Sequence, residues 1–126
     1  MLAEKATTTR RWTFDHHRLN AWQVAFEALV LGNKLVKGVP RGNGALVDQV
    51  KRALSGMFTQ TSEGSARTGA DRLSRFRIAR AEAGEAAAVM EALIALGLVN
   101  AASGERELEL LWRVCAMLTK LARLGS

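Results

Sequence analysis

The chain has 126 residues, a length typical of one domain with a hydrophobic core of its own. Apolar residues make up 48% of it, but it contains four Phe, three Trp and no Tyr, so small and aliphatic side chains must fill the core. A single proline favours long helices over short strands and turns. The one cysteine excludes an internal disulfide, and neither a signal peptide nor a membrane-spanning run is evident. We therefore expect an all-α, cytoplasmic protein.

The formal net charge is +6, and most of the basic residues are arginines. A polyanion such as RNA or DNA is the natural partner to consider, because the planar guanidinium donates two parallel hydrogen bonds to a phosphate. A basic surface that only keeps the protein in solution explains the charge equally well. Charge alone does not decide between these interpretations.

Residues 1–13 have no hydrophobic period and predict a flexible basic tail. The rest of the chain, residues 14–126, is expected to form a helical bundle. Asp15 is placed to cap a first helix over residues 16–37. Alternating steps of three and four residues put a row on one face of this helix, interrupted by a polar residue: Leu19, Trp22, Phe26, Leu29, Asn33 and Val36. Glycines around Pro40 then reverse the chain.

Three further helices are predicted, over residues 45–63, 70–98 and 104–124. The second ends at Gly64, and its inward positions are Leu46, Val50, Ala53 and Met57. The inner row of the third consists of Leu73, Phe76, Ala83, Ala87, Met90 and Ile94. The inner row of the fourth consists of Leu108, Leu111, Cys115, Leu118 and Ala122. Because the connections are short, consecutive helices must run antiparallel, which predicts an up-down-up-down four-helix bundle.

Two of the predicted helices carry more apolar surface than one inner face needs. In the first helix, Trp22 and Phe26 are assigned to the core or to an oligomer interface. A second apolar row on that helix consists of Val24, Ala28, Leu31 and Leu35. In the fourth helix the extra row consists of Leu110, Val114, Met117 and Leu121. A helix that is apolar on two sides is usually buried on two sides, which predicts self-association.

The residue types that carry catalysis or metal binding form no motif. His16 and His17 are adjacent and point in different directions, whereas two metal ligands on one helix need a spacing of three or four residues. Glu82 and Glu85 lie close together, but neighbouring arginines make ion pairing the simpler interpretation. We expect no metal, no cofactor and no enzymatic activity.

Five arginines fall between residues 67 and 80, and these form the core of a predicted basic surface. Seven side chains are assigned to nucleic-acid binding: Lys51, Arg52, Arg67, Arg72, Arg75, Arg77 and Arg80. The first two extend the surface if the second and third helices are neighbours. Arg75 and Arg77 are expected to face outward. Arg72 and Arg80 flank the inner row, and Arg80 is predicted to form a structural ion pair with Glu63.

The leading hypothesis is a non-catalytic oligomeric protein that contacts the RNA or DNA backbone without base specificity. The alternative is a structural or adaptor homo-oligomer that binds a protein partner and uses its arginines for subunit salt bridges. The pairing of the arginines distinguishes the two hypotheses. Unpaired arginines on one face favour nucleic acid, and arginines matched to Glu82, Glu85 or Glu91 favour the adaptor.

Several short motifs share their order and spacing with a known family. They are Phe14 with Ala21-Trp22-Gln23, Val39-Pro40, Leu46 with Gln49 and Lys51-Arg52-Ala53, Gln60 to Glu63-Gly64, Arg67, Ile78-Ala79-Arg80, Glu85 and Leu96-Gly97. Through these residues the chain resembles, from about Phe14 to Val99, a bacterial four-helix-bundle family. That family includes proteins encoded in intervening sequences of large-subunit ribosomal RNA genes and the accessory protein of diversity-generating retroelements.

The resemblance implies an antiparallel four-helix protomer assembled into a homopentameric ring with a central channel. It also implies nucleic-acid binding through a basic surface and, for the retroelement branch, partnership with a reverse transcriptase. The chain departs from the family pattern where Ser-Ile-Pro-Ala becomes Gly56-Met57-Phe58-Thr59, so the proline kink is absent. Glu82 replaces a family serine and puts a carboxylate inside the basic segment.

Overall fold

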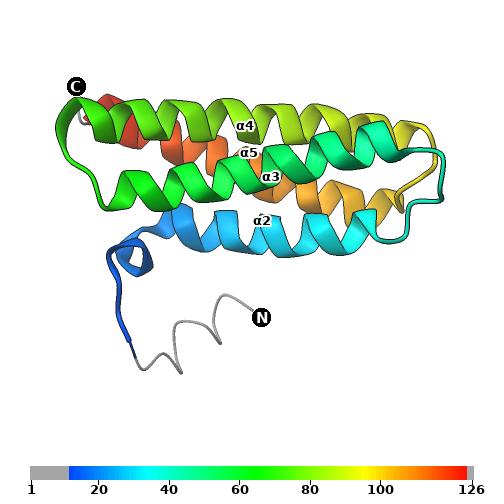
Figure 1. Ribbon diagram of the computed structural model, residues 1–126, viewed down its shortest axis with the longest axis horizontal. Coiled ribbons are helices and arrows are strands. Elements are labelled where there is room, and N and C mark those ends of the chain that lie inside the picture. Colours follow the sequence, from blue (N-terminus) through cyan, green and yellow to red (C-terminus); the bar gives the residue numbers. More distant parts are fainter. Residues whose placement is uncertain (1–11, 125–126) are drawn as a thin grey trace.

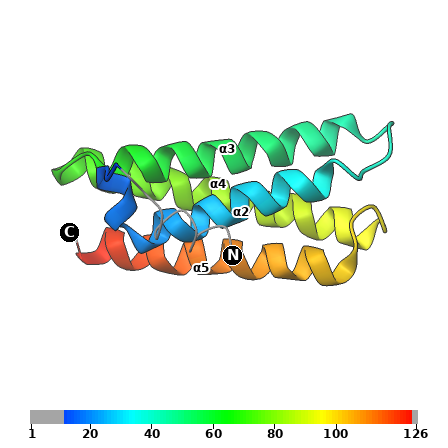
Figure 2. The ribbon, with the colours of Figure 1, turned by 90° about the horizontal axis from the view of Figure 1, so that it is seen from below.

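The computed structural model describes residues 12–124, which form four long antiparallel helices (Figures 1 and 2). A 3-10 turn, η1 (Asp15–Arg18), precedes α2 (Asn20–Val36), α3 (Gly44–Ser65), α4 (Gly69–Ala95) and α5 (Ala101–Leu124). Each helix packs on its neighbours in sequence, and α5 packs back on α2. The predicted all-α four-helix class is confirmed for the described residues, which contain no strand. Residues 1–11 of the predicted tail lie outside them.

The first long helix begins four residues later than predicted, because residues 15–18 form a separate turn. The Nδ1 atom of His17 holds this turn by accepting a hydrogen bond from the backbone N–H of Phe14 at 3.0 Å. Leu19 is extended, with φ −99° and ψ 114°, and α2 then starts at Asn20. Asp15 therefore lies within η1 and does not cap α2.

The connection between α4 and α5 also differs from its predicted position. The chain leaves α4 at Ala95, and Gly97 adopts a φ of +74°, a conformation that favours glycine. The side-chain oxygen of Asn100 accepts a hydrogen bond from the N–H of Ser103 at 3.1 Å, as a helix cap does. With this cap α5 begins at Ala101, three residues before the predicted start at residue 104.

The core face of α2 consists mainly of small residues and lies between the two predicted rows. Ala25, Ala28 and Gly32 are buried, while Phe26 is half-buried. Trp22 is buried, and its Nε1 atom donates a hydrogen bond to Ser62 Oγ of α3 at 3.0 Å. The small side chains allow close packing of the helices, and the tryptophan ties α2 to α3.

The predicted inner rows of α3 and α4 agree largely with the core. The buried members of these rows are Val50, Ala53, Met57, Phe76, Ala83 and Met90. The remaining members are half-buried at the edge of the core: Leu46, Leu73, Ala87 and Ile94.

The core face of the last helix lies between its two predicted rows. Leu111 and Leu118 of the predicted inner row are buried, as expected. Leu110 and Val114, assigned to a spare apolar row, are 1% and 0% exposed and lie in the core of their own protomer. Met117 and Leu121 of the same row are half-buried against that core. Cys115, predicted to face inward, is half-buried at the surface. The apolar row of α5 is therefore no sign of self-association, because the bundle itself uses it.

Candidate nucleic-acid interface

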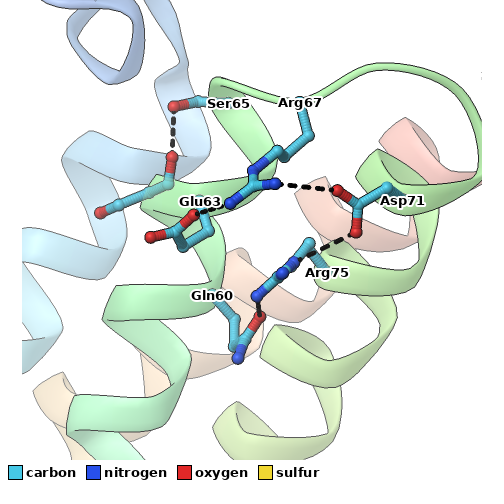
Figure 3. A network of polar contacts seen from close by, with 7 residues as sticks. Gln60, Glu63, Ser65, Arg67, Asp71 and Arg75 are labelled. Carbon is cyan, nitrogen blue, oxygen red and sulfur yellow. Dashed lines mark hydrogen bonds and ion pairs between the residues drawn. The ribbon is translucent and has the colours of Figure 1, made fainter.

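The arginines at the α3–α4 connection are paired with acids of their own chain (Figure 3). Arg67 lies 3.0 Å from a carboxylate oxygen of Glu63 and 3.4 Å from one of Asp71. Asp71 also accepts a hydrogen bond from Arg75 Nε at 3.3 Å, and Arg75 reaches the side-chain oxygen of Gln60 at 3.4 Å. Exposed pairs of this kind are screened by solvent and contribute little to stability. They do neutralise two of the arginines assigned to nucleic acid.

Arg72 has a structural role at the end of α3. Its Nη1 atom donates hydrogen bonds to the carbonyl oxygens of Gly64 at 2.9 Å and Ser65 at 3.4 Å. Its guanidinium also lies 4.7 Å from the centre of the Phe76 ring. A cation at these C-terminal carbonyls satisfies acceptors that the helix leaves open. These contacts hold the Arg72 guanidinium against the end of α3, which agrees with its predicted position beside the inner row. Few of its N–H groups are left to bind a ligand.

The predicted ion pair between Glu63 and Arg80 is wrong. Glu63 pairs with Arg67, which lies four residues later in the connection between α3 and α4. Arg80 instead faces α5, where its Nη1 atom donates a hydrogen bond to Thr119 Oγ1 at 3.2 Å. The Thr119 hydroxyl in turn donates to the carbonyl oxygen of Cys115 at 2.8 Å, so its remaining lone pairs face the guanidinium. The sequence could not reveal this contact because it depends on the register between α4 and α5.

Three arginines share an open hollow of about 210 Å³ between α4 and α5. Arg77 and Arg80 come from α4 and Arg123 from α5, with Thr119 and Ala122 completing the wall. Within residues 12–124, no carboxylate lies within ion-pair distance of Arg77 or Arg80. Sequence analysis assigned the two α4 arginines and missed Thr119 and Arg123, whose spacing of four residues on the basic end of α5 was the available signal.

Lys51 and Arg52 do not extend this hollow, although α3 and α4 are neighbours. Gln49 of α3 donates a hydrogen bond to Glu85 of α4 at 3.3 Å, which sets the register of the two antiparallel helices. Lys51 and Arg52 therefore lie level with the middle of α4, about 10 Å along its axis from Arg77 at 1.5 Å per residue.

Basic charge is concentrated at the end of the bundle where the α3–α4 connection and the C-terminus meet (Figure 1). Residues 12–24, 60–80 and 115–124 make up this basic end and carry eight Lys or Arg side chains against three Asp or Glu. The other described residues carry seven basic and eight acidic side chains. The excess positive charge of the described chain thus lies in one half of the bundle, where it raises the local concentration of anions.

Glu107 is the most unusual carboxyl group of the chain. It is fully buried on α5, far along the helix from the basic end, and neither of its oxygens has a hydrogen-bond partner within the described residues. Burial raises its pKa from 4.5 to about 8, and the charge of Arg106 opposes the shift. Within the described residues, no titratable side chain forms a hydrogen bond with Glu107, so the geometry around it provides no acid–base pair.

No group of three metal-ligating side chains occurs among residues 12–124, and no helix in this range has the length and apolar character to cross a membrane. A comparison of the chain with protein-family models and with curated proteins found no match. The family resemblance therefore stays a prediction based on the motif residues.

Proposed function

We propose that this protein is a non-catalytic accessory protein that binds the phosphate backbone of RNA or DNA through the basic end of its bundle. The observation that supports the proposal is the hollow between α4 and α5, where Arg77 and Arg80 lie together without a carboxylate partner in the described chain. The positive charges that line the hollow repel one another, so a bound anion would stabilise the cluster. Phosphate suits these guanidinium groups, because two of its oxygens can accept paired hydrogen bonds from one arginine.

The orientation of Arg80 makes the hollow a better phosphate site than a set of mobile surface arginines. Its hydrogen bond to Thr119 restrains the guanidinium before a ligand arrives, which lowers the entropy lost on binding. Lys120 and Arg18 flank a neighbouring hollow of about 340 Å³ between α5 and the start of α2. These cations belong to the same basic end of the bundle and add to the positive charge that a polyanion would meet there.

The adaptor hypothesis receives less support from the pairing of the arginines. Within residues 12–124, none of the carboxylates Glu82, Glu85 and Glu91 forms an ion pair with an arginine. Glu85 accepts a hydrogen bond from Gln49 instead. The pairs that do form around Asp71 lie within one protomer and need no partner.

Three further statements rest on the sequence and are part of the proposal. The first is membership of the ribosomal intervening-sequence and retroelement family, with the reverse transcriptase partner that it implies. The second is the homopentameric ring. The apolar row of α5 does not support this ring, because Leu110 and Val114 are buried in the core of their own protomer. The third is a cytoplasmic location.

Charge reversal at the hollow tests the proposal. We expect R77E/R80E to lower affinity for labelled RNA or DNA by at least about tenfold at low salt, because two phosphate contacts become repulsive. The salt dependence should also weaken, since each lost contact removes about 0.9 from the slope of log K against log salt on a duplex. Fluorescence anisotropy over a salt series measures both quantities.

The matched control is K34E/K37E, which makes the same change of charge at exposed positions at the opposite end of the bundle. This variant should keep most of the wild-type affinity. If the wild type fails to bind at low salt, the proposed function is wrong. If both variants lose affinity equally, general charge and not the hollow is responsible.

A further inference from the structure

Two aromatic side chains are exposed at the basic end of the bundle, just before α2. Trp12 is 65% exposed and Phe14 is 59% exposed. The two residues lie two positions apart and precede η1, and both belong to the basic end as defined above. A group of exposed rings in one place, unlike a single exposed side chain, marks a candidate binding surface.

The ring of Phe14 is held in place by other aromatic rings. It lies parallel to the imidazole of His16, with an interplanar angle of 4° and 5.8 Å between the ring centres. The centre of the His16 ring lies 4.5 Å from that of Trp22, which is buried and bonded to Ser62 of α3. The backbone N–H of Phe14 is fixed by its hydrogen bond to His17. A flat ligand that stacks on Phe14 therefore costs the protein little freedom, because the ring is already ordered.

Arg18 connects these rings to the hollow of Arg77, Arg80 and Arg123, here called the arginine hollow. It ends η1, four residues after Phe14, and is exposed. Figure 2 shows η1 between the ends of α3 and α5.

The cations follow one another across this end of the bundle. Arg18 and Lys120 of α5 line the same hollow of about 340 Å³. Lys120 directly follows Thr119, which lines the arginine hollow. Within residues 12–124, no carboxylate lies within ion-pair distance of Arg18. A line of cations thus leads from the arginine hollow to the aromatic rings.

Exposed rings beside cations distinguish a single strand of nucleic acid from a duplex. In a duplex the bases stack on one another, so a ring on a protein surface meets the backbone and the base edges but no base face. In a single strand the bases turn outward and stack on aromatic side chains, while basic residues hold the phosphates. Every base has a flat face, so this contact needs no particular sequence.

We propose that the basic end binds single-stranded RNA or DNA, with bases stacked on Phe14 and Trp12 and phosphates held by Arg18 and the arginine hollow. The proposal rests on the nucleic-acid function proposed above and names the form of nucleic acid that the site prefers. Phe14 is the main platform because its ring is anchored, and Trp12 offers a second ring. A duplex uses the cations alone and binds more weakly.

Titration of one variant with a single strand and with its duplex tests the proposal. We expect F14A to lower affinity for a mixed-sequence single strand of about 15 nucleotides by at least about fivefold, the loss typical of one stacked base. Affinity for the duplex that this strand forms with its complement should stay unchanged. The slope of log K against log salt should also stay unchanged, because Phe14 contacts no phosphate. Fluorescence anisotropy measures these quantities for RNA and for DNA.

Two comparisons separate stacking from the loss of apolar surface. F14L keeps an apolar side chain without a flat ring and should bind the single strand as weakly as F14A, whereas F14W should bind as the wild type does. The matched control is L96A, which removes an exposed apolar side chain at the opposite end of the bundle and should leave affinity unchanged. Circular dichroism should show unchanged helicity for all four variants, because both positions are exposed.

Trp12 provides a direct signal of stacking. A base that stacks on an indole quenches its fluorescence, so a single strand should quench the wild type. W12F should lose most of this quenching and keep its affinity, because phenylalanine also stacks. The matched control is W112F, since Trp112 is exposed on α5 outside the basic end and its replacement should leave the quenching in place.

The possible results separate this proposal from the function on which it rests. If R77E/R80E weakens the binding of both forms and F14A weakens neither, the proposed function stands and the stacking surface is wrong. If F14A instead changes the mass of the protein in light scattering, Phe14 belongs to a subunit interface, and the stacking surface is again wrong. A wild type that binds neither form at low salt overturns both proposals.

Discussion

Replacing Glu107 with glutamine is expected to remove the loss of stability that the wild-type protein suffers as pH rises from about 4.5 to about 8. The side chain is fully buried, and its carboxylate packs where a Cβ atom at Gly32 of α2 would collide with it. Neither oxygen has a hydrogen-bond partner in the described chain. The interior therefore tolerates the neutral acid far better than the charged carboxylate.

The sign follows from the protonation of the two states. Below pH 4.5 the Glu107 carboxyl is protonated in both the folded and the unfolded chain, so its titration does not change the free energy of unfolding. Between 4.5 and about 8 the unfolded chain ionises while the folded chain keeps its proton, so stability falls steadily with pH. Above about 8 both states are ionised and the loss levels off, at a few kcal/mol, since each unit of pKa corresponds to about 1.4 kcal/mol.

Urea unfolding at about pH 5, 7 and 9 measures the effect, at a concentration of about 1 µM to keep association out of the comparison. The wild type should lose stability across this series, and E107Q should not. E91Q removes an exposed glutamate from α4 and should follow the wild type. An E107Q profile that falls in parallel with the wild type would mean that Glu107 titrates normally in the folded state.

Alanine is expected to destabilise the protein at Gly64 and to stabilise it at Gly84, although both glycines lie within helices. A Cβ atom at Gly64 would lie 2.5 Å from Cε1 and 2.7 Å from Cδ1 of Phe76. That ring is fully buried and has the Arg72 guanidinium against it, so it cannot turn aside without disturbing the core. Overpacking of this kind costs about 1 to 3 kcal/mol.

At Gly84 the same substitution meets open space. Alanine there removes backbone freedom from the unfolded chain and should raise stability by about 0.5 to 1 kcal/mol. Thermal unfolding of the two variants, followed by circular dichroism, should therefore show shifts of opposite sign. A G64A protein as stable as the wild type would show that Phe76 can repack, and the close contact between α3 and α4 would not be a constraint.

Sequence analysis found the basic region but not the arrangement of its charges. It assigned Arg77 and Arg80 to nucleic-acid binding, and the hollow brings these two together with Arg123. It also included Arg67 and Arg75, which local acids neutralise, and Arg72, which closes the end of α3. The pair between Asp71 and Arg75 was readable in advance, since neighbours at a spacing of four residues meet on any helix. Arg67 lies between α3 and α4, so its pairs with Glu63 and Asp71 depend on the path of that connection. The bond from Arg80 to Thr119 was not readable either, because it joins two helices.

The number, order and approximate limits of the four helices were determined by the sequence alone, because hydrophobic period and glycine or proline breaks act over a few neighbouring residues. The direction that each helix face takes was decided by the tertiary structure. With apolar residues on two sides, α5 had two possible inner rows, and packing against α2 and α4 chose a face between them, which buries Leu111 and Leu118 of one row together with Leu110 and Val114 of the other. That choice turned Trp112 outward and buried Glu107, because rotation of one helix moves every side chain on it together.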